Sequence, residues 1–224
     1  MDTASPEAPE VFQGQFGPYT ITPADLRSVT LYRAGLVLAA LTFALGTGLG
    51  LAFSARPWLV QAISGCYTLF WLGLGLSLAT IHIYLVPLHR LLQGFWLVGG
   101  VASLGIAHLI DGPLAQTVVA YPASLWGVGF TFAALTGVYF KEAFCFNRLE
   151  TKLLTPLVPF LLLGHLFGFL PLVAKQGLLV LWAILFLGFA LRKVSQPRVP
   201  DLGDKSVFDY LKRQRPTATA STPG

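Results

Sequence analysis

The chain carries little charge. Asp, Glu, Lys and Arg make up 11% of its 224 residues, against roughly a quarter in an average soluble domain. Apolar residues reach 54%, and the mean hydropathy is +0.67. A soluble globule with so few charged side chains could not cover its surface with polar groups. The composition therefore excludes a soluble enzyme, a nucleic-acid-binding domain and a disordered chain, and it predicts an all-α, polytopic membrane protein.

Cysteines and catalytic motifs are scarce as well. The two cysteines, Cys66 and Cys145, have no CxxC or metal-type spacing, so we expect neither a disulfide framework nor a metal site. No HExxH, GxSxG, P-loop or paired-carboxylate pattern occurs in the sequence, and these patterns identify common hydrolases and nucleotide-binding proteins. We therefore expect no enzymatic activity and no cofactor.

Six apolar runs are long enough to cross a bilayer. A helix needs about 20 mostly apolar residues to cross some 30 Å of hydrocarbon, and proline, glycine or charge separates the runs. The last run is short, and we expect basic side chains at its ends to reach the head groups. The predicted spans are approximately 31–54, 58–86, 94–110, 116–140, 153–174 and 177–191.

The basic residues predict the orientation of the bundle. If six spans place both termini on one side, that side carries all 15 Lys and Arg residues except Arg56 and Lys175. Segments rich in Lys and Arg stay on the cytoplasmic side of a membrane. We therefore expect both termini in the cytoplasm, or in the stroma if the membrane is a thylakoid.

Polar segments flank the spans. Residues 1–22 are rich in Pro and Gly and lack a basic signal-peptide region, so we expect a flexible N-terminus. Thr22 and Pro23 predict a helix start, with Thr22 as its N-cap and Asp25 in the first turn. Residues 193–224 are basic and are expected to be largely disordered. A short helix at 204–213 is predicted to lie on an anionic leaflet, with a solvated tail as the alternative.

Small residues recur at intervals of four in four of the spans. Such stripes let helix backbones approach closely. We interpret them as contacts within the bundle, and contact between copies of the chain is the alternative. The stripes are Gly46 and Gly50; Gly99, Ser103 and Ala107; Gly129, Ala133 and Gly137; and Gly164 and Gly168.

Ionisable residues within spans are candidate site residues, because charge is costly in hydrocarbon. We expect His165 near the middle of the fifth span and His82 near the cytoplasmic end of the second, and each is a candidate single ligand of a haem or pigment. Their different depths disfavour a haem held by two histidines. His108 and Asp111, on the opposite face, are candidates for ion or proton binding. For each histidine the alternative is a hydrogen bond to a neighbouring carbonyl or hydroxyl.

The segment 141–152, KEAFCFNRLETK, places charged and aromatic side chains together on the cytoplasmic side. We interpret it as a surface that docks another protein. The alternative is an interfacial anchor that supports packing of the fourth and fifth spans. The predicted partner-binding residues are Glu142, Phe144, Phe146, Asn147, Arg148 and Glu150.

Two stretches resemble a family of uncharacterised integral membrane proteins of cyanobacteria and plastids, defined by a domain of unknown function. They are GVYFKEAFCFNRLETKLLTPLVPFLLLGHLFGFL, from Gly137, and HIYLVPLHRLLQGFWLVGG, from His82. The resemblance covers about residues 19–195. It implies a photosynthetic host and so a thylakoid or plasma membrane, and it supplies no catalytic residues.

These observations predict a non-enzymatic scaffold or assembly partner of photosynthetic membrane complexes. Its expected partners are the lipid bilayer and other membrane proteins. A small-molecule or ion transporter is the first alternative, although no Asp or Glu falls inside a predicted span and transporters commonly place acids there. A pigment- or haem-binding protein is the second.

Overall fold

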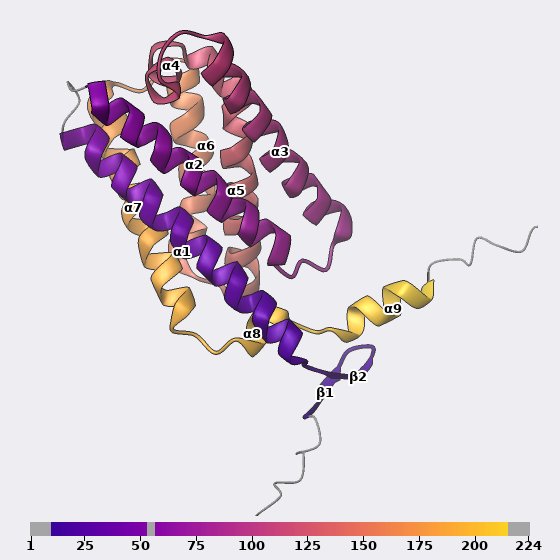
Figure 1. The fold of residues 1–224 in the computed structure, drawn as a ribbon. Helices are drawn as coiled ribbons and strands as arrows, with labels where there is room; N and C mark the ends of the chain where they lie inside the picture. Colours follow the sequence, from indigo (N-terminus) through magenta and orange to yellow (C-terminus); the bar gives the residue numbers. More distant parts are fainter. Residues whose placement is uncertain (1–9, 53–56, 215–224) are drawn as a thin grey trace, which may run out of the picture. The chain divides into compact units, whose positions relative to one another are not determined.

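The computed structural model describes residues 10–52 and 57–214. Almost all regular structure in them is helical (Figure 1). Six helices, α1, α2, α3, α5, α6 and α7, are long and apolar enough to cross a membrane, which confirms the predicted six-helix architecture. The elements are β1 (Val11–Gly14), β2 (Gly17–Thr20), α1 (Pro23–Ala52), α2 (Pro57–Thr80), α3 (Val86–Leu109), α4 (Leu114–Ala120), the 3-10 turn η1 (Pro122–Ser124), α5 (Leu125–Phe146), α6 (Leu149–Leu166), α7 (Leu172–Val194), α8 (Val199–Leu202) and α9 (Ser206–Gln214).

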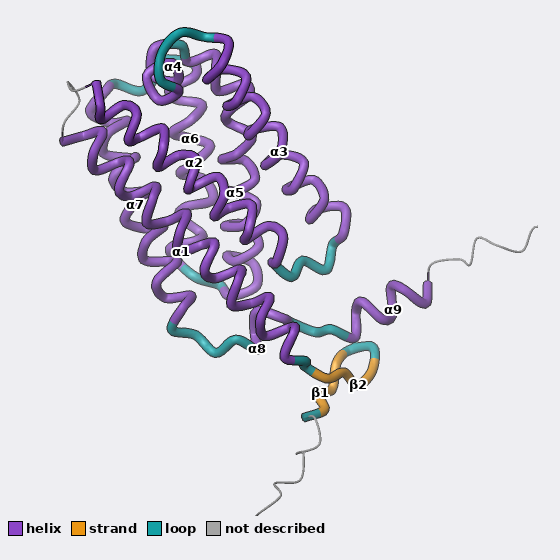
Figure 2. The backbone as a smooth tube through the Cα atoms, in the orientation of Figure 1, coloured by secondary structure: helices purple, strands orange, loops and turns teal. Residues whose placement is uncertain are grey.

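Contacts within the chain define two compact units. Of the described residues, those of 31–196 form the helical bundle, and 10–30 with 197–214 form a terminal unit. In the bundle the long helices run side by side, and the short α4 lies at one end (Figure 2). Aromatic side chains fill the bundle core. Phe43 and Phe132 both pack on Trp182, with ring centroids 4.4 and 5.4 Å away.

The boundary between α2 and α3 differs from the prediction. The predicted second span continues to residue 86 and the predicted third begins at residue 94, whereas α2 ends at Thr80 and α3 begins at Val86. The predicted boundary was wrong because we treated Pro87 as a residue that separates two spans. It lies in the first turn of α3, where proline's missing N–H would have had no helical partner. His89 and Arg90 therefore belong to α3 and not to a loop.

The predicted fourth span, 116–140, is divided. α4 ends at Ala120, η1 begins at Pro122, and α5 then continues to Phe146, six residues beyond the predicted end. Asn147 ends α5 in the left-handed conformation, with φ of 52°, and its N–H donates to the Ala143 carbonyl at 3.0 Å. Most of the segment that we predicted as a charged connection is therefore helical.

The bounds of the last two helices, α6 and α7, also differ from the predicted spans. α6 ends at Leu166, shortly before Gly168, whose φ is 72°, a conformation that suits glycine. Pro171 then caps α7. Lys175 and Gln176, predicted to separate two spans, lie in the first turns of α7. With 23 residues, α7 is long enough to cross the membrane without help from its flanking charges.

The terminal unit contains an element that the sequence analysis missed. β1 and β2 pair as an antiparallel hairpin, from Val11 opposite Thr20 to Gly14 opposite Gly17, where we expected a flexible segment. The predicted start of α1 is confirmed. The Thr22 N–H donates to Asp25 Oδ2 at 2.7 Å, and the Asp25 N–H donates to Thr22 Oγ1 at 3.2 Å, so the two side chains cap the helix reciprocally.

The C-terminal segment joins this hairpin. Lys205 Nζ donates to Asp25 Oδ2 at 2.6 Å and to the Thr20 carbonyl at 3.0 Å. Hydrogen bonds from the Ser206 hydroxyl and the Gln15 N–H lower the pKa of Asp204, because both donors favour the ionised carboxylate. These contacts order residues that we expected to be mostly disordered.

The predicted short helix at 204–213 forms as α9, Ser206–Gln214. Its position on an anionic leaflet stays a prediction. The predicted disorder of residues 215–224, and the flexibility of residues 1–9, concern segments that lie outside the described residues.

Candidate functional site

An apolar cavity of about 900 Å³ lies in the bundle, lined by α1, α2, α4, α5, α6 and α7. This volume is at the upper end of the range for ligand sites, roughly 300–1,000 Å³. Two glycines of α1, Gly46 and Gly50, help to leave the space open. A Cβ atom at Gly50 would meet only Ile63 within 4 Å, at 3.5 Å. Phe43 and Trp182 line another part of the wall.

His165 and Lys175 provide polar groups in this cavity. His165 Nε2 lies 3.3 Å from the Val118 carbonyl oxygen, and Nδ1 lies 3.5 Å from Lys175 Nζ. An ammonium can only donate a hydrogen bond, so Nδ1 accepts and Nε2 carries the proton donated to the carbonyl. His165 is thus neutral and joins α6 to α4 and α7.

Lys175 has no carboxylate partner among the residues that the structure describes. Its side chain is half-buried in the first turns of α7. Its hydrogen-bond partner is the neutral imidazole of His165. A positive charge therefore borders the apolar cavity without a compensating negative charge.

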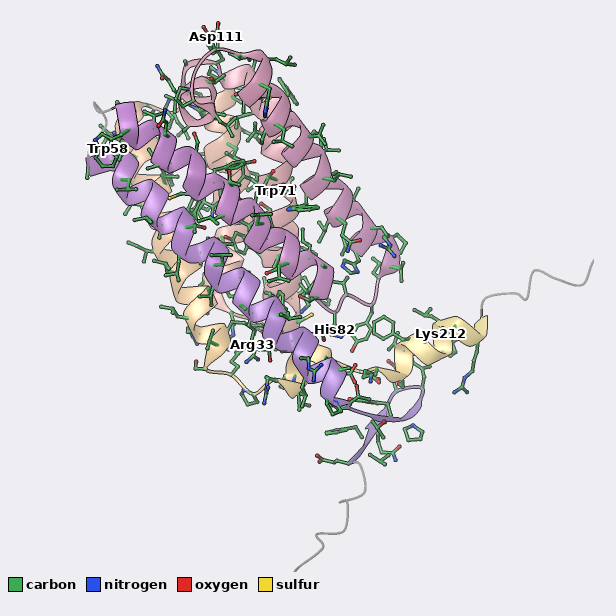
Figure 3. All side chains as sticks on the ribbon, viewed as in Figure 1. Arg33, Trp58, Trp71, His82, Asp111 and Lys212 are labelled. Carbon is green, nitrogen blue, oxygen red and sulfur yellow. The ribbon has the colours of Figure 1, made fainter. Side chains whose placement is uncertain are left out.

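Of the two predicted haem or pigment ligands, His165 lies elsewhere than expected, whereas His82 lies just beyond the end of α2, close to its predicted place. His165 lies at the end of α6, one residue before the last, because α6 ends at Leu166. It therefore does not lie near the middle of a span, as we had predicted. Both of its ring nitrogens lie close to other groups, so axial ligation would break one of these contacts. His82 follows the end of α2 and lies in a loop. Figure 3 shows His82 at the end of the bundle opposite Asp111.

The predicted ion or proton site, His108 and Asp111, is exposed. His108 Nδ1 lies 2.8 Å from the Leu104 carbonyl oxygen of its own helix, the kind of contact that the sequence analysis gave as the alternative. Asp111 lies in the turn after α3. Within residues 10–52 and 57–214, no group of three His, Cys, Asp or Glu side chains could hold a metal ion.

The predicted docking residues do not form one surface. Glu142 is 0% exposed and Glu150 is 8% exposed, whereas Phe144 is 83% exposed. Asn147 is also exposed, and the remaining two, Phe146 and Arg148, are half-buried. The physical reason is helical period. Because α5 continues to Phe146, Glu142 shares the inward face of the buried Val138 and Tyr139, four and three residues earlier.

Glu142 is the centre of a buried polar network that the sequence analysis missed. Its carboxylate accepts from Lys193 Nζ at 2.5 Å, Lys141 Nζ at 2.8 Å and the Tyr32 hydroxyl at 2.9 Å. Lys193 is only 1% exposed, and its ammonium lies 3.7 Å from the centre of the Phe146 ring. The network joins α1, α5 and α7.

A signal for this network was present in the sequence. Lys193 follows Phe186, Phe189 and Ala190, all buried, at intervals of seven, four and three residues, which is the period of one helix face. We assigned Lys193 to the solvated tail because the predicted span stopped at residue 191. A second ionic contact lies nearby, where Glu150 pairs with Arg148 at 3.5 Å and Arg192 at 3.3 Å.

Comparison with known proteins supports the membrane architecture. A family model described as "Uncharacterized integral membrane protein (DUF2301)" matches residues 76–210, more than half of the chain. No curated protein and no solved structure matches. The match begins later than the resemblance that we expected from residue 19, and it continues past residue 195 into the C-terminal segment. The chain therefore belongs to the integral membrane protein family DUF2301.

Proposed function

We propose that the protein is a non-enzymatic binding protein that takes an amphipathic molecule from the lipid phase into the bundle cavity. The observation that carries this proposal is the cavity of about 900 Å³. Its wall is mostly apolar, and His165 and Lys175 add polar groups to it. Ligand sites commonly combine an apolar wall with a few polar groups that orient the ligand.

The cavity favours binding of a small molecule over the scaffold that the sequence analysis put first. The proposed docking surface loses Glu142 and Glu150, which are buried. Its exposed Phe144 is followed five residues later by Leu149, which is 69% exposed, and two such apolar side chains at a bundle end suit an interfacial anchor. A photosynthetic membrane, thylakoid or plasma membrane, remains our proposal for the location and rests on the sequence resemblance.

Filling the cavity is expected to weaken ligand binding. In Gly50→Leu, the new side chain would occupy part of the cavity and displace about two methylenes of a bound tail. At about 0.8 kcal/mol per methylene, binding should fall about tenfold. The measurement is photolabelling in nanodiscs by palmitic acid and by hexadecanol, each with a diazirine in the tail, followed by mapping of the labelled peptides.

Gly48→Leu is the matched control. Gly48 lies two residues away in α1 and is exposed, and nothing lies within 4 Å of a Cβ atom built there. Labelling of cavity-lining peptides should therefore remain at the wild-type level in this variant. Equal labelling of the two variants, or labelling confined to peptides outside the cavity, would refute the proposed function.

We also propose that both termini face the cytoplasm or the stroma. The predicted charge bias supports this orientation, and so does the position of Arg33 at the end of the bundle opposite Asp111 (Figure 3). Epitope tags at the two chain ends should both react with antibody from the cytoplasmic or stromal side of sealed vesicles. Tags that react from opposite sides would contradict an even number of spans.

A further inference from the structure

We infer that the ligand of this cavity is an amphipath with a carboxylate head group that pairs with Lys175. The inference rests on the proposed function, since it concerns the same cavity. It adds the chemistry of the head group, which the apolar wall by itself does not define.

The positive charge of Lys175 favours a ligand with an anionic head group. Lys175 lines the cavity, and its polar contact is with a neutral imidazole, 3.5 Å away. Within the described part of the chain no acid neutralises it. An uncompensated ammonium beside apolar surface is costly. An anionic head group would supply the missing charge through a charge-assisted hydrogen bond.

The amount of positive charge in the cavity also favours a carboxylate head group. Among the described lining residues, Lys175 is the only Lys or Arg, so the site offers one positive charge. One carboxylate balances it, whereas a phosphate monoester carries nearly two negative charges at neutral pH. Gln116 and Gln176 also line the cavity. Their amide groups are further hydrogen-bond donors for a carboxylate oxygen.

The orientation of His165 positions the Lys175 ammonium. Its Nδ1 accepts from Lys175, while its Nε2–H is used by the Val118 carbonyl. These contacts link Lys175 to α6 and α4 and so hold the ammonium beside the cavity. The apolar wall, including Phe43 and Trp182, is then available to the tail of the ligand.

The test compares two probes with the same tail and different heads. Tail-diazirine palmitic acid and hexadecanol are titrated against the full-length protein in nanodiscs, at a pH where the acid is ionised. We expect the carboxylate to bind the wild-type cavity about tenfold more tightly than the alcohol, as one charge-assisted hydrogen bond predicts. Lys175→Met should abolish this preference, so that the carboxylate binds no more tightly than the alcohol, and Lys175→Arg should retain the preference.

Lys152→Met is the matched control, because it also removes one positive charge and Lys152 is exposed in α6. The carboxylate preference should persist in this variant. Retained binding of the alcohol shows that Lys175→Met is folded, and Lys175→Gln serves the same comparison if that variant does not fold.

The outcomes separate the two proposals. If both probes label the wild-type cavity equally, or if the preference survives Lys175→Met or is lost in Lys152→Met, the head-group inference is wrong and the proposed function stands. If neither probe labels the cavity, the proposed function itself is wrong.

Discussion

Glu142→Gln is expected to lower the free energy of unfolding of the bundle by about 3–5 kcal/mol, the usual cost of removing one partner from a buried ion pair. The substitution keeps the shape of the side chain and removes its charge. Lys193, 1% exposed, would then hold a buried ammonium without its carboxylate. The contact of that ammonium with the Phe146 ring compensates only in part, since a cation–π interaction contributes about 2 kcal/mol when desolvated.

The measurement is reversible unfolding in mixed micelles by titration with SDS. Lys152→Met is the control for charge, because it removes an exposed charge and should change stability by less than about 0.5 kcal/mol. The double variant Glu142→Gln/Lys193→Met should be more stable than Glu142→Gln, because it also removes the buried Lys193 ammonium that had faced the carboxylate. A Glu142→Gln protein as stable as the control would show that this network does not stabilise the bundle.

Gly99→Ala is expected to destabilise the bundle by about 1–3 kcal/mol, the range for overpacking of a tight contact. A Cβ atom at Gly99 would lie 3.0 Å from Thr131 Cα and closer still to the Thr131 amide nitrogen and hydroxyl. Backbone atoms cannot give way as a flexible side chain can, so α3 and α5 would have to separate.

Separation of these helices would also disturb the hydrogen bonds at this contact. The Tyr67 hydroxyl lies 2.7 Å from Ser103 Oγ and 3.1 Å from Thr131 Oγ1, and Ser103 donates to the Gly99 carbonyl at 2.7 Å. Gly105→Ala is the control in the same helix, because nothing lies within 4 Å of its Cβ position. SDS titration should show Gly105→Ala to be neutral or slightly stabilising, since alanine favours a helix over glycine. Equal effects of the two substitutions would contradict a tight α3–α5 contact.

The spacing of the glycines in the sequence does not predict which of them make close contacts between helices. Gly99 makes the close contact within the bundle that we predicted from its spacing to Ser103. Gly46 and Gly50 have the same spacing and both line the cavity. A Cβ atom at Gly46 would also lie 3.3 Å from Cys66 of α2, whereas one at Gly50 would make only an ordinary contact with Ile63, at 3.5 Å. The same four-residue interval has two different results, because the residue that faces a stripe comes from another helix and is not encoded nearby in the sequence.

The candidate site was predictable only in part. His165 was found because an ionisable side chain in an apolar run is unusual. Its neighbours Val118 and Lys175 come from two other helices, α4 and α7, 47 and 10 residues away in the sequence. Which helices pack beside α6 depends on the tertiary structure, so the polar groups of the cavity could not be predicted. The sequence also indicated Glu142 as a site residue, but we assigned it to a surface. The predicted fourth span ended at residue 140, so the helical period was not extended to Glu142 and did not show that it faces inward.

Three properties follow from the amino-acid sequence alone: the membrane class, the number of long helices and the capped start of α1. These properties depend on composition, on the length of apolar runs and on contacts between residues three apart, such as Thr22 and Asp25. The packing of the helices is needed to show which side chains share a cavity, and that Lys193 of α7 meets Glu142 of α5. The reason is that helix phase and neighbour choice depend on packing between segments distant in the chain, and a hydrophobic pattern defines only which face of each helix is apolar.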